Sequence, residues 1–153
     1  YRVVESRTSA DGKMTRNTGT GAQVSASGKV NFPEIRDVAR ISVYWRAAIM
    51  TDGDKSKVFH EYFTVAGPGF LRMFSFPMLH GDRNHALTEP RSIVLTETTA
   101  SKFFGAVDVV GRSIFMDDDS VPYKVTGVLK DFSANSSISS SFGASTDPAS
   151  RNT

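Results

Sequence analysis

A strand that leads directly into a capped helix is the feature of this sequence that most restricts its fold. Ser92–Leu95 is a short apolar segment typical of a buried strand, and Thr96 follows it as a helix N-cap. Glu97 suits the positive end of the helix dipole, and Gly105 is well placed to end the helix. The inner face of this helix is predicted to hold Ala100, Phe103 and Phe104.

Alternating patterns elsewhere predict further strands. Arg40–Met50 is predicted to be a half-buried strand, and Lys57–Ala66 is predicted to return antiparallel to it after a turn at Thr51–Lys55. Tyr1–Arg7 indicates another short strand. The alternation predicts one shared face for Ile41, Val43, Trp45, Ala47 and Ile49.

The last part of the ordered sequence indicates two strands around a turn. Arg112–Met116 and Tyr123–Asp131 are the predicted strands, and Asp117–Pro122 is the turn between them. We expect Tyr123, Val125 and Leu129 to share a face.

Three segments interrupt this strand pattern. Phe70–Phe74 is predicted to form one apolar helical turn that stops before Pro77. Thr8–Gly28 is rich in Ser, Thr and Gly and is predicted to be a long exposed loop or hairpin tip. Gly81–Arg91 is predicted to be a polar loop.

Length and composition indicate one compact domain. With 153 residues, 39% of them hydrophobic, the chain is long enough to bury a core. The predicted class is α+β, with a mixed or antiparallel sheet and short helices packed on one face. The domain is expected to span residues 1–138, and residues 139–153 are expected to be a flexible polar tail.

Charge and cysteine content exclude several kinds of function. The net charge of +2 comes from 18 basic and 16 acidic residues that are scattered along the chain, so no nucleic-acid partner is expected. The absence of cysteine excludes disulfides, thiolate catalysis and cysteine-ligated zinc.

No segment approaches the ~20 apolar residues of a membrane span. Because the sequence begins at Tyr1 without a signal segment, we expect it to be a piece of a longer protein.

Polar residues with catalytic or metal-binding potential do not form a recognised pattern. The acidic run Asp117–Asp119 lacks the alternate spacing and glycine of a calcium loop, so a solvated turn is predicted there. His60, His80 and His85 match no metal-ligand spacing. Gly19–Gly21 does not join a strand to a helix as a phosphate loop would, and no serine-nucleophile elbow is present. The sequence therefore predicts no catalytic, cofactor-binding or metal-binding residues and no cofactor.

Aromatic residues leave two interpretations open, a packed core and an apolar ligand cleft. The core interpretation is favoured because the chain contains 11 phenylalanines and one small domain must bury them. The residues in question are Phe63, Phe70, Phe74, Phe76, Phe103 and Phe104.

Four blocks in order resemble a known family. They are FPEIRDVARI (Phe32–Ile41), FLRMFSFPMLHGD (Phe70–Asp82), SIVLTETTASKFFG (Ser92–Gly105), and VGRSI with YKVTGVLKDFSANSSI (Val110–Ile114 and Tyr123–Ile138). Together they resemble the MacB-like periplasmic core domain of FtsX-like ABC transporter permeases, most of all the versions in Bacteroidetes-type bacteria. The family domain normally continues past the last block, so residues 1–138 are expected to be an incomplete domain.

The resemblance implies a non-catalytic domain on the extracytoplasmic, periplasmic face of the bacterial inner membrane, in a membrane-anchored protein. Such a domain would transmit ATP-driven conformational change for export, including efflux, or for mechanotransmission. The implied partners are a second permease subunit or permease half, a cytosolic ABC ATPase reached through the membrane domain, and a periplasmic adaptor.

Two other hypotheses stay open from the residues alone. One is a soluble extracytoplasmic ligand-binding module that uses the phenylalanines as a pocket. The other is a hydrolase that pairs His80 or His85 with the Asp117–Asp119 carboxylates. If the chain has an interaction surface, the long loops Thr8–Gly28 and Gly81–Arg91 are the places where we expect it.

Overall fold

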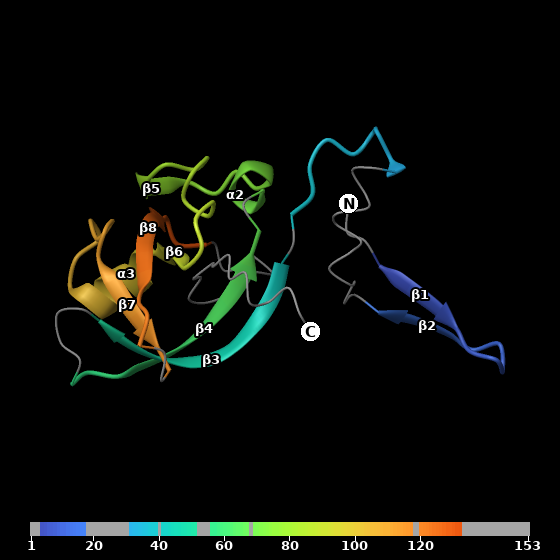
Figure 1. Ribbon diagram of the computed structural model, residues 1–153, viewed down its shortest axis with the longest axis horizontal. Coiled ribbons are helices and arrows are strands. Elements are labelled where there is room, and N and C mark those ends of the chain that lie inside the picture. The colour runs from blue at the N-terminus through green and yellow to red at the C-terminus, as the bar shows by residue number, and fades with distance from the viewer. Residues whose placement is uncertain are drawn as a thin grey trace. The chain divides into compact units, whose positions relative to one another are not determined.

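The structure is a computed structural model that describes residues 4–17, 31–39, 41–51, 56–67, 69–117 and 120–132. The chain divides into two compact units, Tyr1–Val38 and Ala39–Thr153. Among the described residues, the first unit contains a two-stranded hairpin, and the second contains a six-stranded sheet with two short helices (Figure 1).

The hairpin of the first unit pairs β1 (Glu5–Thr8) with β2 (Met14–Asn17) in antiparallel orientation. Gly12 lies in the turn with a left-handed φ of 81°, which a residue without a side chain adopts without strain. The expected first strand, Tyr1–Arg7, is confirmed for Glu5–Arg7, residues 1–3 lie outside the described residues, and a hairpin tip at the start of Thr8–Gly28 is confirmed. A loop is the wrong prediction for Met14–Asn17, and residues 18–28 lie outside the described residues.

The sheet of the second unit has the strand order β4-β3-β7-β8-β5, and β6 also pairs with β8 (Figure 1). The β6–β8 pair is parallel, and every other pair described in this sheet is antiparallel. The predicted α+β class is therefore confirmed. The strands are β3 (Ile41–Thr51), β4 (Phe59–Ala66), β5 (Met78–Gly81), β6 (Ser92–Thr96), β7 (Ser113–Met116) and β8 (Tyr123–Leu129).

Strand β5 is the element of this sheet that sequence pattern missed. Its four residues have no β-branched side chain and no apolar alternation. Met78 and Gly81 pair with Leu129 and Gly127 of β8, so the strand forms because a long-range partner satisfies its backbone.

Within the described part of the second unit the helices are α2 (Phe70–Met73) and α3 (Glu97–Phe104), both where the sequence predicts them. The Thr96 hydroxyl accepts a hydrogen bond from the Thr99 amide at 3.3 Å, which caps the N-terminus of α3. Gly105 ends α3 in the left-handed conformation, with φ of 71°.

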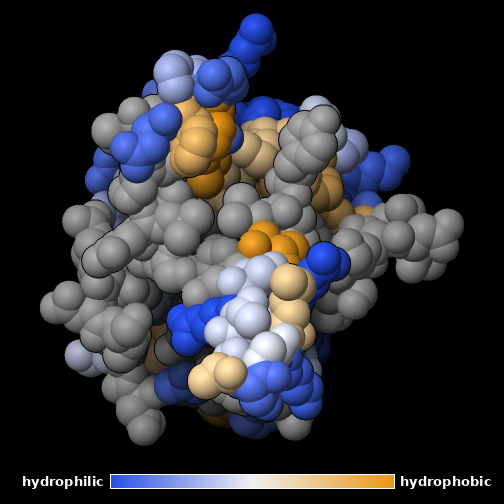
Figure 2. All heavy atoms as spheres, turned by 90° about the vertical axis from the view of Figure 1, so that its right-hand side faces the viewer, coloured by the Kyte–Doolittle hydropathy of each residue, from blue (hydrophilic) through white to orange (hydrophobic). Residues whose placement is uncertain are grey.

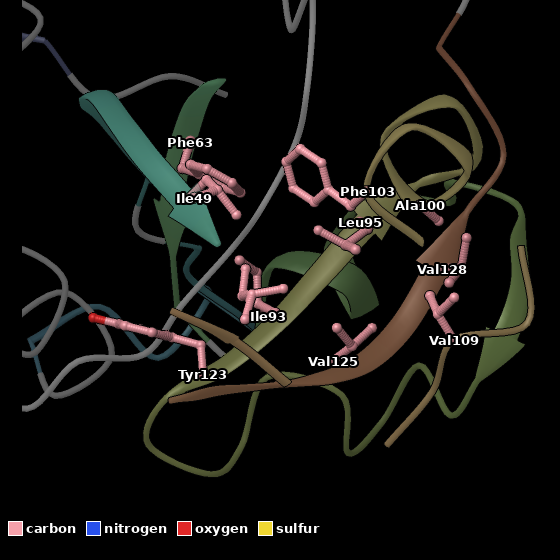
Figure 3. Close-up of a cluster of buried hydrophobic side chains, with 11 residues drawn as sticks. Ile49, Phe63, Ile93, Leu95, Ala100, Phe103, Val109, Tyr123, Val125 and Val128 are labelled. Atoms are coloured by element: carbon pink, nitrogen blue, oxygen red, sulfur yellow. The ribbon is translucent and has the colours of Figure 1, made fainter. Parts of the chain in front are cut away.

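Buried side chains of the second unit form two clusters. Figure 3 shows the first cluster, in which side chains from β3, β4, β6, β8 and α3 point toward one another. The second cluster packs α2 and the Gly81–Arg91 loop against the sheet. The first contains Ile49, Phe63, Ile93, Leu95, Ala100, Phe103, Val109, Ile114, Tyr123, Val125 and Val128, and the second contains Ala66, Phe70, Leu71, Ala86, Leu87, Val94 and Leu129.

Strand β6 shows that the two clusters lie on opposite faces of the sheet. Ile93 and Leu95 belong to the first cluster, whereas Val94 between them belongs to the second. All five residues of β6 are buried, as expected for a strand that is covered on both sides. The short helices do pack on the sheet, but they divide between its faces, with α3 in the first cluster and α2 in the second.

A register shift in β3 overturns the single face predicted for its apolar residues. Ile49 is fully buried, but Ile41 is 44% exposed. The pairing with β4 shifts by one residue between Val43 and Arg46, which is the effect of a β-bulge. One extra residue in a strand exchanges the two faces beyond it, so Ile41 and Ile49 lie on opposite faces.

A second register shift divides the apolar residues of β8. Tyr123 and Val125 lie in the first cluster, but Leu129 lies in the second, so the prediction that all three share a face is wrong for Leu129. The pairing of β6 with β8 shifts between Ile93 and Val94, where Thr126 is the extra residue on β8. The same inner face continues at Val128 instead.

Candidate functional site

Two of the three histidines lie beside carboxylates, each beside a different one. His80 Nδ1 lies 3.5 Å from Asp108 Oδ1, and His85 hydrogen-bonds Asp82 within its own turn. His60 lies on β4 and is exposed. The acids beside His80 and His85 are therefore different from the Asp117–Asp119 carboxylates that the hydrolase hypothesis requires.

The Asp82 carboxylate forms hydrogen bonds within its own turn. The hydrogen bond with His85 is the largest of the effects that lower the pKa of Asp82, and a bond from the Asn84 amide adds to it. A carboxylate that accepts bonds from the next few residues stabilises a tight turn. The Asp82–His85 pair therefore stabilises the turn of the Gly81–Arg91 loop.

Other polar candidates lie in turns or outside the described residues. Asp117 is exposed and has a left-handed φ of 51°, which fits the predicted turn, and Asp118 and Asp119 are not described. Gly19–Gly21 also falls outside the described residues. Within the described ranges, no group of three or more His, Asp or Glu side chains is placed to hold a metal ion.

Phenylalanine side chains divide between the two clusters and contact one another. Phe103 packs against Phe59 with ring centroids 5.0 Å apart in the first cluster. Phe70 contacts Phe74 at 5.0 Å and Phe76 at 5.6 Å in the second. Phe63 belongs to the first cluster, and Phe104 packs against it. This ring-to-ring packing is what a core requires, and it places the six residues on two faces and not around one shared cleft.

The Gly81–Arg91 loop has polar residues at its surface and two apolar residues buried in the second cluster. Asp82, Asn84, His85, Thr88 and Glu89 are exposed, and we call these five residues the loop crest. Ala86 and Leu87 between them are 3% and 1% exposed, because they enter the second cluster. The prediction of a polar loop is therefore confirmed for the loop crest and wrong for Ala86 and Leu87 in the middle of the loop.

Arg83 fixes the loop to the preceding segment. Its guanidinium donates to the main-chain oxygens of Leu71 and Phe74, each at 3.2 Å, and of Phe76 at 2.5 Å. Two of these oxygens lie at the end of α2, where helical carbonyls lack partners within the helix. The planar fork of arginine suits several acceptors at once, so Arg83 holds the loop and α2 together.

The base of the loop is held from the sheet side as well. Thr126 of β8 donates its hydroxyl hydrogen bond to the Ala86 oxygen, and it also lies 3.2 Å from the Ile93 oxygen. At the loop end, Arg91 adopts a φ of 58° and donates to the Val121 oxygen at 2.9 Å. Sequence pattern identifies none of these anchors, because each depends on a residue distant in the chain.

The hairpin tip of the first unit is the other predicted interaction region. Ser9 donates its hydroxyl hydrogen bond to Asp11, and its amide donates to the Lys13 oxygen at 3.0 Å. All side chains described from Ser6 to Arg16 are exposed. Among the residues coloured in Figure 2, hydrophobic ones form small separate groups between hydrophilic ones.

Within the described ranges, no helix has both the length and the apolar composition of a membrane span.

Three solved structures share this fold. A domain of a protein assigned as a permease from Porphyromonas gingivalis aligns with a TM-score of 0.69 and 23% identity, over 85% of this chain and 60% of its own. The periplasmic region of MacB from Actinobacillus actinomycetemcomitans aligns with a TM-score of 0.57 and 15% identity, over 83% and 61%. The extracellular domain of the noncanonic ABC-type transporter YknZ from Gram-positive bacteria aligns with a TM-score of 0.57 and 16% identity, over 78% and 58%.

The chain is shorter than these relatives, since it spans about three fifths of the length of each aligned structure. No curated protein sequence matches it. A family model does match, and it describes the MacB-like periplasmic core domain over residues 2–149, which is nearly the whole chain. The order of the sequence blocks, the α+β sheet and this match agree, and the chain belongs to the MacB-like periplasmic core domain family.

Proposed function

We propose that this chain is an extracytoplasmic domain of a MacB/FtsX-like ABC transporter permease, and that it transmits ATP-driven conformational change for export or mechanotransmission without catalysing a reaction itself. The family match over residues 2–149 is the observation that carries the proposal. The likeness to the MacB periplasmic region and to the YknZ extracellular domain supports it at the level of the fold.

The packing of the sheet supports such a mechanical role. A body that transmits displacement must resist deformation, and close-packed interiors have low compressibility. The sheet is packed on both faces, with Leu95 and Val94 of one strand fully buried on opposite sides. Motion is therefore expected between this body and its neighbours, as in a rigid-body transition.

The partners belong to the proposal too. They are a second permease subunit or permease half, a cytosolic ABC ATPase that acts through the membrane domain, and a periplasmic adaptor. We propose the loop crest as a contact surface, because Arg83 and Thr126 hold its base while its polar side chains stay exposed. Such a surface loses little conformational entropy when it binds.

The experiment uses the absence of cysteine in this chain. Asn84→Cys is introduced into the full-length permease, with any cysteine elsewhere replaced, and intact cells are treated with a maleimide that does not cross the cytoplasmic membrane. Asn84 is exposed, so rapid labelling is expected if the domain is extracytoplasmic. Ser92→Cys is the matched control, because Ser92 is 2% exposed and a buried thiol is labelled only after unfolding.

Transmission is tested with the same variant in the complex of permease and ATPase. Spin labels on Asn84→Cys in two permease copies are expected to change their separation between the nucleotide-free and the ATP-bound complex. An identical distance distribution in both states contradicts transmission. Labelling of Asn84→Cys only after cell lysis contradicts the extracytoplasmic location.

A further inference from the structure

Three consecutive residues after β8 bind three different parts of the second unit. The Lys130 amide donates to the Pro77 oxygen at 2.9 Å. The Asp131 carboxylate accepts two hydrogen bonds from Thr98 of α3. The Phe132 ring packs edge-on against Phe76 with centroids 4.8 Å apart. We call Lys130, Asp131 and Phe132 the exit staple.

The contact of Asp131 with α3 is bidentate. Its Oδ1 accepts from the Thr98 amide at 3.0 Å, and its Oδ2 accepts from the Thr98 hydroxyl at 2.6 Å. Amides in the first helical turn have no partner within the helix, and the helix dipole favours a negative charge there. Asp131 therefore supplies from 33 residues away a bond that local caps usually supply.

The ionisation of Asp131 agrees with this geometry. Burial raises the pKa of the Asp131 carboxyl, but hydrogen bonds from the hydroxyl and amide of Thr98 and from Thr96 outweigh it, so the net pKa is lowered. The carboxylate is thus stabilised in its charged form, which is the form that accepts both bonds.

The contacts of the exit staple reach both faces of the sheet. Thr98 belongs to α3, the helix of the first cluster, while Phe132 packs against the second cluster together with Phe76. Phe76 in turn contacts Phe70 of α2 at 5.6 Å. The chain that leaves β8 is consequently joined to both helices within three residues.

We propose that the exit staple is a mechanical joint, which makes α2, α3 and the sheet move as one body with the segment that leaves β8. This inference rests on the proposed function, in which that movement originates in the ATPase. Without the staple, a displacement of the following chain would first stretch the segment after Leu129. With it, the displacement reaches both packed faces directly.

Hydrogen exchange tests the joint in the full-length permease bound to its ATPase. Asp131→Ala removes both acceptors, so exchange of the Thr98 amide is expected to accelerate about tenfold or more, the effect of losing one charge-assisted hydrogen bond. Thr98→Val keeps the amide and removes only the hydroxyl, so a smaller acceleration is expected. Asp108→Ala is the control, because Asp108 is an exposed carboxylate that lies beside His80. Unchanged Thr98 exchange in Asp131→Ala overturns the proposal.

Motion is tested with spin labels on Ser101→Cys in α3 and Lys130→Cys in the staple, because the Lys130 side chain is exposed and the substitution keeps the amide that binds Pro77. In the otherwise native permease the distance between them is expected to stay the same in nucleotide-free and ATP-bound complexes, and in Asp131→Ala with Phe132→Ala it is expected to broaden or shift. A native distance that changes with nucleotide overturns the joint. Failure of the proposed function appears differently, as a constant Asn84→Cys distance between copies while Thr98 exchange still responds to Asp131→Ala.

Discussion

At the scale of single residues, two glycines allow β5 and β8 to approach closely. A Cβ atom on Gly81 would lie 2.4 Å from the Thr126 oxygen and 2.8 Å from the Gly127 Cα. Gly81 also has a φ of 94°, which side chains rarely permit. Since both obstacles are backbone atoms, no rotation of a side chain relieves the clash.

Gly81→Ala is therefore expected to reduce the free energy of unfolding by about 3 kcal/mol, through overpacking and backbone strain together. Gly105→Ala is the matched control. Its φ of 71° is also left-handed, but nothing lies within 4 Å of the added Cβ, so about 1 kcal/mol of strain is expected. Urea unfolding of the three proteins measures both values. Equal losses for the two variants would show that close approach at Gly81 is not the cause.

The distance in sequence between a residue and its hydrogen-bond partners explains which structural roles could be predicted. Thr96 and Gly105 act on backbone groups within a few residues of themselves, so the start and end of α3 follow from sequence. Arg83 has no such local partner pattern, since its acceptors lie 7 to 12 residues earlier. For that reason the polar crest of the Gly81–Arg91 loop was predictable and its anchor was not.

At the scale of elements, register shifts decide which side chains enter the core. In β3 the alternation of apolar residues is unbroken in sequence, yet the pairing with β4 shifts between Val43 and Arg46. A bulge depends on the neighbouring strand and leaves no mark in the alternation itself. Ile41 and Ile49 are consequently similar in sequence context and opposite in environment.

These two isoleucines give a matched test of the bulge. Ile49→Ala removes a fully buried side chain and is expected to lower the free energy of unfolding by about 2–5 kcal/mol. Ile41→Ala trims a side chain that is 44% exposed, so a loss below about 1 kcal/mol is expected. Chemical denaturation of both variants gives the comparison. Similar losses would contradict the register assigned to β3.

At the scale of the whole molecule, stability at low pH depends on a few carboxylates that are hydrogen-bonded in the folded state. Asp131 is the most informative, because its lowered pKa comes with two hydrogen bonds to α3. Its folded pKa lies below the ordinary value of 3.8, so near that pH the unfolded chain binds more protons than the folded chain. The stabilisation is complete above 3.8 and is lost as pH falls through the folded pKa.

Asp131→Asn is expected to be less stable than the native chain at pH 7, and this difference is expected to shrink as the pH falls below 3.8. The physical reason is that protonation removes from the native carboxylate the charge that the variant already lacks. Urea unfolding at pH 7, 4 and 3 measures the difference. A difference as large at pH 3 as at pH 7 would show that the charged form is not what binds Thr98.

The sequence by itself determined the α+β class, the span of α3 and the family, because caps, alternation and block order are local or linear properties of the chain. Tertiary structure decided the rest: the division of the core by β6, the opposite environments of Ile41 and Ile49, and the exit staple at Asp131. Each of these depends on hydrogen bonds or packing between residues far apart in the chain. Such partners are chosen only when the whole sheet satisfies its backbone groups and buries its apolar side chains together.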